Sequence, residues 1–317
     1  MSGRKATAFV AAADEGAGGT PQVEVEHVQR VYDCIARSWH GTRYKAWPRV
    51  EAFARALPRG SLIADVGAGN GKNLPACAET GVLGEPTGPS FPIASDLSFE
   101  LARICAERGF QVAAADVTRL PFRTGAFDAV LCIAVLHHLS TRARRETACA
   151  ECCRLLTPGG RAVFYAWAQE QEPSAGAARA LSRTDDAADG GYSGHRFPTQ
   201  DVLVPFHVPL RCVDMRGDGE HAPRAGAGAD LSAAVRVSVG AADDGDGAGA
   251  AAAREHGASY DAAKRSVVFQ RYCHVYCRGE LESLFEPLVR AGAVAVEQSW
   301  YDCGNWCAVV VRLPGGP

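Results

Sequence analysis

The sequence lacks any long apolar run and any strong excess of charge of one sign. Lys and Arg number 33 and Asp and Glu number 36 among 317 residues, so the formal net charge is −3. This balance excludes a strongly basic coat over the whole chain, although it leaves room for a local basic face. No apolar stretch approaches the roughly 20 residues that a membrane-spanning helix needs, so we expect no membrane partner.

We expect no secretory signal, and aromatic residues are absent over a long stretch of the chain. The first residues, MSGRKATAFVAAADEG, are short of apolar length and soon turn acidic. The twelve cysteines fall within apolar patterns, which favours reduced thiols in an intracellular protein. Residues 211–258 hold no Phe, Trp or Tyr, and such a segment buries too little apolar surface to offset its ordering entropy. We therefore expect residues 1–21 to be disordered and residues 173–263 to form a largely flexible insertion, with a short ordered segment near 200–210.

Outside these stretches, strand and helix patterns alternate along the chain. We expect strands at 61–66, 93–96, 110–116, 127–134 and 161–167, helices at 98–108 and 141–156, and a last helix and strand at 279–292 and 305–313. Alternation of this kind is typical of a mostly parallel sheet with helices on both faces. The sequence thus predicts one α/β domain, built from residues 22–172 and 264–315, whose final strand is antiparallel.

A glycine-rich turn, Asp65-Val-Gly-Ala-Gly-Asn-Gly71, follows the first predicted strand. Open α/β sheets bind ligands at the carboxyl ends of their strands, and glycines let the backbone approach a ligand closely. The spacing is G-x-G-x-G, and no Lys-Ser/Thr pair follows it. This disfavours both a G-x-G-x-x-G dinucleotide site, and with it an NAD-dependent dehydrogenase, and a P-loop. The alternative is a turn that only joins a strand to a helix.

Two acidic residues end the next two predicted strands. Asp96 is placed to accept hydrogen bonds from both ribose hydroxyls of a nucleoside. Asp116 is placed to accept one from an adenine amino group. Each of them could instead cap a helix N-terminus, a position that Asp favours.

The glycine turn and these two acids resemble the class I S-adenosylmethionine-dependent methyltransferases. The segments Phe127–Ile133 and Leu155–Gly160 fit the same family. The resemblance covers residues 60–167 and implies a Rossmann-like sheet with S-adenosylmethionine as the cofactor. It implies cofactor contacts at Asp65, Gly67, Gly69, Asn70, Gly71, Asp96, Leu97, Asp116, Val117 and Ala134.

A narrower resemblance comes from motifs on both sides of this region. His27–Ala36, Thr42–Pro48, Ile133–His138, Thr141–Arg145, Tyr165–Glu170, Asp201–Pro205, Tyr272–Tyr276, Gly279–Leu281 and Tyr301–Trp306 look like those of the tRNA wobble-uridine carboxyl-methyltransferases. That family esterifies 5-carboxymethyluridine in the tRNA anticodon loop and works with a small zinc-binding activator subunit. The resemblance implies the same substrate, the same partner in a heterodimer, and a cytoplasmic or nuclear location.

The implied reaction needs positioning more than proton transfer. A carboxylic acid with a pKa of about 4 is already ionised at pH 7, so no general base is required. An Arg or His is expected to hold the carboxylate oxygen that does not react. From the shared motifs we expect Arg43 and His137 to be catalytic, although either could be a surface or structural residue. The other expected substrate contacts are Tyr44, Lys45, Trp47, His138, Arg144, Arg145, Asp302, Asn305 and Trp306.

Several of these expectations concern RNA. Residues 27–59 hold seven Lys and Arg against Asp33 and Glu51, and Arg142, Arg144 and Arg145 add to this local excess. Such residues could meet phosphates, while Tyr44 and Trp47 could stack on an unpaired base. Charge runs are usually only solvated faces, so this observation is weak by itself.

Two other possibilities remain open at this point. A small-molecule methyltransferase would share the glycine turn and the Leu-His-His segment, and a non-catalytic module would keep only the fold. Two C-x₃-C pairs, Cys273/Cys277 and Cys303/Cys307, suggest zinc. If both pairs lie on strands, however, residues four apart are roughly 13 Å apart and cannot share one ion. We therefore expect no metal.

Overall fold

The structure is a computed structural model that describes residues 6–9, 19–42, 45–80, 88–171, 197–213 and 247–315. Two of the expected site residues, Arg43 and Tyr44, lie outside the described residues. The chain divides into two compact units, one of Met1–Val204 with Arg271–Pro317 and one of Pro205–Gln270. Among the described helices, none combines the length and the apolar character needed to cross a bilayer.

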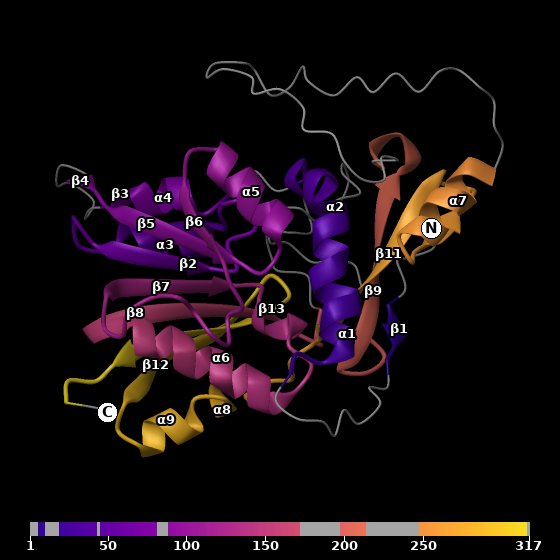
Figure 1. Ribbon diagram of the computed structural model, residues 1–317. Coiled ribbons are helices and arrows are strands. Elements are labelled where there is room, and N and C mark those ends of the chain that lie inside the picture. Colours follow the sequence, from indigo (N-terminus) through magenta and orange to yellow (C-terminus); the bar gives the residue numbers. More distant parts are fainter. Residues whose placement is uncertain are drawn as a thin grey trace. The chain divides into compact units, whose positions relative to one another are not determined.

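A seven-stranded sheet forms the centre of the first unit (Figure 1). The strands β8, β7, β2, β5 and β6 pair in parallel, whereas β13 is antiparallel to β8 and β12 is antiparallel to β13. The predicted α/β class with an antiparallel final strand is therefore confirmed. In order across the sheet, the strands are β12 (Val294–Asp302), β13 (Asn305–Arg312), β8 (Leu156–Trp167), β7 (Phe127–Ile133), β2 (Leu62–Val66), β5 (Phe91–Asp96) and β6 (Gln111–Ala114).

Helices cover both faces of this sheet because its central strands are apolar on both sides. On β2, Ile63 packs in a cluster with α3 (Pro48–Arg55) and α4 (Leu74–Ala78). The next residue, Ala64, belongs to the opposite cluster with α6 (Arg142–Leu155) and α8 (Glu280–Ser283). Successive strand residues point to opposite faces, so each face receives its own core.

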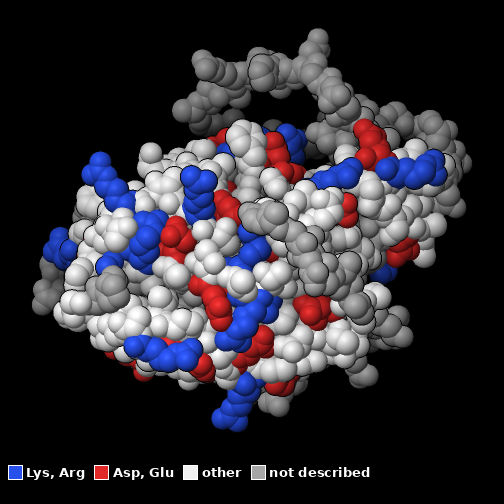
Figure 2. All heavy atoms as spheres, turned by 60° about the horizontal axis from the view of Figure 1, so that its bottom comes forward, with Lys and Arg blue, Asp and Glu red and all other residues white. Residues whose placement is uncertain are grey.

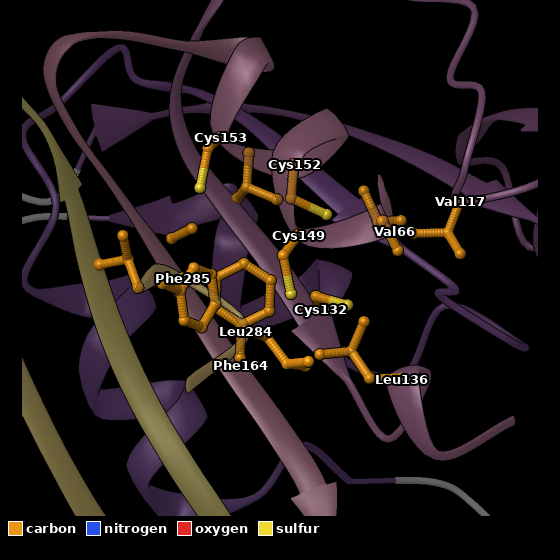
Figure 3. Close-up of a cluster of buried hydrophobic side chains, with 14 of the residues drawn as sticks. Val66, Val117, Cys132, Leu136, Cys149, Cys152, Cys153, Phe164, Leu284 and Phe285 are labelled. Carbon is orange, nitrogen blue, oxygen red and sulfur yellow. The ribbon is translucent and has the colours of Figure 1, made fainter. Parts of the chain in front are cut away.

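Cysteine sulfur fills much of the core on the α6 face. Cys132 of β7 lies among Cys149, Cys152 and Cys153 of α6, beside Phe164 and Phe285 (Figure 3). No two of the twelve cysteines form a disulfide in the structure. Burial raises the pKa of the Cys149 and Cys153 thiols, and a hydrogen bond with Cys132 together with burial raises that of Cys152. These thiols therefore stay protonated and pack as small apolar groups.

The N-terminal helices lie over the carboxyl end of the sheet. After α1 (Gln22–Glu24) and a π-helical turn (Val25–Gln29), α2 (Arg30–His40) packs on α5 (Phe99–Glu107). The Ser98 hydroxyl donates to Asp33 of α2 at 2.6 Å and also accepts from the Leu101 N–H, which caps α5. One serine thus fixes both the start of α5 and the position of α2.

Some expected boundaries need correction. The expected helix at 279–292 is two short helices, α8 and α9 (Glu286–Arg290), because Pro287 lacks the N–H that a continuous helix would use there. The last strand has a partner that was not expected, β12, which forms a hairpin with β13. The expected strand at 161–167 begins earlier, at Leu156.

Ordered elements also occur where flexible chain was expected. In the second unit, α7 (Gly247–Glu255) and β10 (Ser259–Asp261) fall within the expected insertion, and β10 pairs with β11 (Ser266–His274). The alanines of α7 favour helix, and a side chain at Gly249 would lie 2.2 Å from the Tyr260 ring, so only glycine permits this packing. In the first unit, β1 (Thr7–Ala8) pairs with the start of β9 (Asp201–Pro209). Three further short elements are β3 (Glu79–Thr80), β4 (Gly88–Pro89) and a 3₁₀ turn (Leu210–Cys212).

Candidate functional site

A pocket opens in the first unit where the parallel strands end. This is the edge at which open α/β sheets bind their ligands. The glycine turn after β2, the acids after β5 and β6, and the segment after β7 all contribute to its wall. Of the expected site residues, the wall contains Trp47, Gly67, Gly69, Asp96, Leu97, Asp116, Val117, Ala134, His137, His138 and Asn305.

Hydrogen bonds from the glycine turn hold the ends of β2 and β5 together. The Gly67 N–H donates to the Ser95 carbonyl at 2.7 Å, and the Gly69 N–H donates to Asp96 Oδ2 at 2.7 Å. Gly69 has a φ of +60°, and a Cβ there would lie 2.9 Å from the Trp39 ring. Glycine is therefore required at this position, both for its backbone conformation and for the close approach of α2.

Asp96 is a largely buried acid on the pocket wall. Its Oδ1 accepts from the Ser98 N–H at 2.9 Å while its Oδ2 accepts from Gly69. Burial raises the pKa of Asp96 to about 6, and these two backbone hydrogen bonds oppose the rise. Asp96 therefore stays mostly ionised at neutral pH and can accept further hydrogen bonds from a ligand.

Three of the expected cofactor residues lie behind the pocket wall. Asp65 is 1% exposed, and burial raises its pKa to about 7. Its Oδ2 accepts from Asn73 Nδ2 at 3.4 Å, while Oδ1 has no hydrogen-bond partner among the described residues. Asn70 contacts His40, and Gly71 packs against Cys105. The structure thus places Asp65, Asn70 and Gly71 as supports of the turn.

Asp116 forms an ion pair with Arg144, so Arg144 does not take the phosphate-binding role expected for it. Asp116 Oδ1 accepts from the Thr118 N–H and hydroxyl, and Oδ2 accepts from Arg144 Nη2 at 2.9 Å. Although burial raises the pKa of Asp116, these hydrogen bonds bring it below its ordinary value. Arg144 also donates to Glu24 Oε2 at 3.0 Å. We had expected Arg144 to meet phosphate, but it joins α1 to the Asp116 loop instead.

His137 and His138 follow β7, and both line the pocket. The His137 ring stacks on Trp167 with ring centroids 4.9 Å apart. His138 Nδ1 lies 2.8 Å from the Tyr272 carbonyl, which only accepts, and Nε2 lies 2.9 Å from the Tyr32 hydroxyl. Burial lowers the pKa of His137 well below its ordinary value and that of His138 to about 4. Both imidazoles are therefore neutral at physiological pH.

The β12–β13 hairpin brings only one of its expected residues to the pocket. Asn305 lines it, and Asn305 Nδ2 donates to the carbonyls of Asp302 and Cys303 at 3.1 and 3.0 Å. Asn305 Oδ1 is buried with no hydrogen-bond partner in the described part of the chain. The Asp302 carboxylate accepts from Tyr165 instead, and Trp306 donates to Glu170, so neither side chain reaches the pocket wall.

Three further expected substrate residues have other surroundings. Arg145 is 6% exposed and donates to the Leu139 carbonyl at 3.0 Å, so it cannot meet a phosphate on the surface. Trp47 is buried against Tyr165, at a centroid distance of 5.2 Å, and forms part of the pocket wall, not an exposed stacking platform. Lys45 is exposed and lies outside the wall.

Histidine and cysteine side chains gather at one end of the pocket. Ligand atoms of His137, His138 and Cys273 lie within 4.8 Å of one another. Both ring nitrogens of His138, however, already have hydrogen-bond partners, and the Cys273 thiol has a pKa raised by burial to about 12. Cys303 lies in the turn between β12 and β13 and not on a strand. Among the described residues, no cluster of three or more potential metal ligands includes Cys277, Cys303 or Cys307.

The pocket also contains residues that the sequence did not single out. Tyr32 and Trp39 come from α2, Trp167 ends β8, and Arg271 lies on β11. Each lies far along the chain from the glycine turn, so no local spacing connects it to the site. Tyr32 and Trp167 could have been found from the sequence, because they lie inside the shared motifs His27–Ala36 and Tyr165–Glu170.

Comparison with known proteins places the chain in a family. A model described as a methyltransferase domain matches residues 64–164. The chain is 31% identical to a tRNA (carboxymethyluridine(34)-5-O)-methyltransferase of Schizosaccharomyces pombe, over 92% of this chain and 98% of that protein. The chain belongs to the tRNA (carboxymethyluridine(34)-5-O)-methyltransferase family.

Other members of this family are longer. The chain is 33% identical to tRNA (carboxymethyluridine(34)-5-O)-methyltransferase alkbh8 of Xenopus tropicalis, over 93% of this chain but only 42% of that protein. It thus spans less than half the length of that relative. Among solved structures, an S-adenosylmethionine-dependent methyltransferase from Methanosarcina mazei is 12% identical with a TM-score of 0.48, and the match covers 85% of this chain and 99% of that one.

Proposed function

We propose that the chain transfers a methyl group from S-adenosylmethionine to the carboxylate of 5-carboxymethyluridine at the tRNA wobble position, giving the methyl ester. The observation that carries this proposal is a single pocket with two ends. Asp96 ends β5 and Asp116 follows β6 at one end of it, whereas Trp167 ends β8 and Asn305 begins β13 at the other. The first end suits a nucleoside cofactor, and the second leaves space for an acceptor base.

The residues at the first end fit S-adenosylmethionine. Asp96 can accept from the ribose hydroxyls because each carboxylate oxygen has a second lone pair beyond its backbone hydrogen bond. Asp116 Oδ2 likewise keeps a lone pair for the adenine amino group beside its bond to Arg144. Leu97, Val117 and Ala134 provide apolar wall. When bound, this cofactor supplies an electrophilic methyl group on a positively charged sulfur.

The protonation of the two histidines suits this reaction. The acceptor carboxylate is already an anion at pH 7, so its attack on the methyl group needs no base. His137 and His138 stay neutral, which avoids repulsion with the sulfonium charge. We propose that His137, fixed against Trp167, lines the methyl-transfer position and that catalysis rests on orientation and exclusion of water.

The RNA-binding surface needs a separate argument. On the face in Figure 2, Lys and Arg side chains are interspersed with Asp and Glu, and several of the expected cations have partners, such as Arg55 with Glu51 and Arg142 with Glu146. This mixed face does not suit a polyanion. Arg30, Arg37, Lys45 and Arg59 are exposed around α2 and α3, as is Arg49, whose Nε lies 3.9 Å from Asp302. We propose these residues for phosphate contacts near the pocket.

A second subunit also belongs to the proposal. The family resemblance implies a small zinc-binding activator, and we propose that it forms a heterodimer with this chain in the cytoplasm or nucleus. The sheet ends at β12 on one side and at β6 on the other. The exposed residues of β12, Glu297, Gln298 and Ser299, are all polar. The strand β6 (Gln-Val-Ala-Ala) has apolar residues and lies next to β5, whose Phe91 is 59% exposed. The β6 edge therefore suits strand addition better.

Methyl transfer to a defined RNA tests the function. The purified chain, with and without the activator, is given labelled S-adenosylmethionine and tRNA carrying 5-carboxymethyluridine, and nucleosides are then analysed by mass. We expect the methyl ester on that base, and Asp96→Asn should weaken cofactor binding roughly 10- to 100-fold because one charged acceptor is lost. Asp128→Asn, at the opposite end of the strands, is the control.

Each negative result would point to a different function. If the folded complex binds the cofactor but leaves this tRNA unmodified, the tRNA assignment fails and a small-molecule substrate becomes the better hypothesis. If the complex does not bind the cofactor at all, the chain acts as a non-catalytic module.

A further inference from the structure

Arg271 is a buried cation on the wall of the pocket that no sequence motif had indicated. Its side chain is 5% exposed, and its guanidinium carbon lies 5.8 Å from the centroid of the Trp167 ring. It comes from β11, more than 100 residues after the strands of the glycine turn and the two acids. Its guanidinium places a positive charge in the wall of the pocket.

The contacts of Arg271 place it at the end of the pocket away from the proposed cofactor acids. Trp167 is the last residue of β8 and pairs with Asn305 of β13. Asp96 and Asp116 follow β5 and β6, which lie across β7 and β2 from β8. A cation beside Trp167 therefore faces the part of the pocket that the proposed cofactor leaves open.

The charge of Arg271 acts on the same space as His137 and His138. It lowers the pKa of both imidazoles, in addition to the larger effect of burial. It also lies close enough to oppose the rise in the pKa of Cys273. Because both imidazoles are neutral, a carboxylate that enters this end of the pocket meets the positive charge of Arg271 beside them. Arg271 is buried, and attraction between opposite charges is strong in such a place.

We propose that Arg271 binds the carboxylate of the 5-carboxymethyl group and thereby selects the modified uridine, an inference that rests on the proposed function. The planar guanidinium matches a carboxylate in geometry as well as charge. With one carboxylate oxygen held by Arg271, a lone pair of the other oxygen forms the new bond to the methyl carbon. The carbon–sulfur bond breaks, and its electron pair stays on sulfur.

The charge balance of this step also favours product release. Before transfer, the carboxylate is an anion beside the Arg271 guanidinium. After transfer, the ester and the thioether product are both neutral, so the attraction to Arg271 falls to that of an ordinary hydrogen bond. Arg271 therefore binds the substrate more tightly than the product.

Discrimination between charged and neutral anticodon loops tests the role of Arg271. Two RNA hairpins are compared, one with 5-carboxymethyluridine and one with the uncharged 5-carbamoylmethyluridine, and their binding is measured on the complex saturated with S-adenosylhomocysteine. The wild-type complex should prefer the carboxylate RNA by about 10- to 100-fold, as expected for a charged hydrogen-bonded pair. Arg271→Gln should remove this preference and leave the affinity for the amide RNA unchanged. Arg161→Gln, an exposed arginine paired with Glu297, is the matched control.

The outcomes separate this inference from the function on which it rests. If wild type neither methylates nor prefers the carboxylate RNA, the proposed function fails. If wild type does both and Arg271→Gln keeps the preference, the role of Arg271 is overturned. Arg271→Lys covers the case in which the Gln variant fails to fold, because lysine keeps the charge but lacks the planar fork. It should raise the KM for the carboxylate RNA at least tenfold with normal cofactor affinity, and an unchanged KM would equally overturn the role.

Discussion

Asp65 carries a carboxyl group that is almost completely enclosed beneath the glycine turn. Burial raises its pKa from 3.8 to about 7, so between these values the folded chain keeps a proton that the unfolded chain releases. Stability must therefore fall as the pH rises through this range, by at most about 1.4 kcal/mol per pH unit. Asp65→Asn removes this dependence and should become steadily more stable relative to wild type from pH 4 to 7, with no further change above.

Urea unfolding of both proteins at several pH values measures this difference. Comparing the two curves cancels His137 and His138, whose lowered pKa values make stability rise with pH over part of the same range. The effect of Asp96, whose pKa is also raised, cancels except for its repulsion of the Asp65 carboxylate, which is the smallest of the causes that shift the pKa of Asp65. A constant offset between variant and wild type across the pH range would contradict the assignment to Asp65.

Residue identity alone predicted part of the site, for a physical reason. Gly69, Asp96 and Asp116 follow or end predicted strands, and parallel topology brings strand ends to one edge of the sheet, whereas Ala134 was implied only by the family resemblance. Arg271 reaches the same pocket through tertiary packing of a strand far along the chain, which no local spacing encodes. Arg145, expected on the surface, is buried by contacts with the carbonyls of the Leu139–Ser140 turn.

At the scale of elements, the packing of α2 on the glycine turn depends on the missing side chain of Gly69. Gly69→Ala places a methyl group 2.9 Å from Trp39 at a φ of +60°, so we expect lower stability and a displaced α2. Gly109→Ala is the matched control, because Gly109 has a φ of +88° and open space around its Cβ position. It should show only the backbone cost, about 1–2 kcal/mol.

Thermal unfolding of the two variants separates backbone strain from the steric effect. Gly69→Ala should melt at least several degrees below Gly109→Ala, since about 1 kcal/mol shifts the Tm of a chain of this size by roughly 2–4 °C. Equal melting temperatures would mean that Trp39 moves aside without cost and that α2 is only loosely held over the pocket.

The elements themselves were predictable to different degrees. The strands β2 and β7 consist mostly of apolar residues and are buried over nearly their whole length, which leaves little choice of structure. The hairpin partner β12 has alternating and partly polar residues at an edge, so its sequence carried a weaker signal. The helix α7 was missed because Gly and Ala lack large apolar side chains, whereas in the second unit small residues allow close packing against Tyr260.

For the whole molecule, the nearly balanced charge means that RNA binding depends on local groups of cations. A net charge of −3 means that attraction for RNA must come from local groups of cations and not from the overall field. Among the described residues, we propose the exposed cations around α2 and α3 and the pocket for this role. Arg144 and Arg145 do not add to this surface, because one is paired with acids and the other is buried. The specificity of binding should then depend on the modified base more than on the phosphates.

The twelve thiols, none of them in a disulfide, provide a test of how tightly the core is packed. Cys34 and Cys212 are exposed and Cys277 and Cys303 partly buried, while the other eight are buried. A thiol reacts as its thiolate, and burial raises the pKa of Cys105 and Cys273 to about 12, so buried cysteines should stay inert in the folded state.

Titration with dithiobis-nitrobenzoate at mildly alkaline pH measures this directly. Native protein should show a fast phase from the two exposed thiols, with Cys34 the slower because partial burial raises its pKa, and all twelve should react only after unfolding. The double variant Cys34→Ser with Cys212→Ser should lose the fast phase and keep its melting temperature. Rapid reaction of more than four thiols in the folded protein would show that the sulfur-rich core between β7 and α6 opens to solvent, and that the sheet face behind the pocket is not rigidly packed.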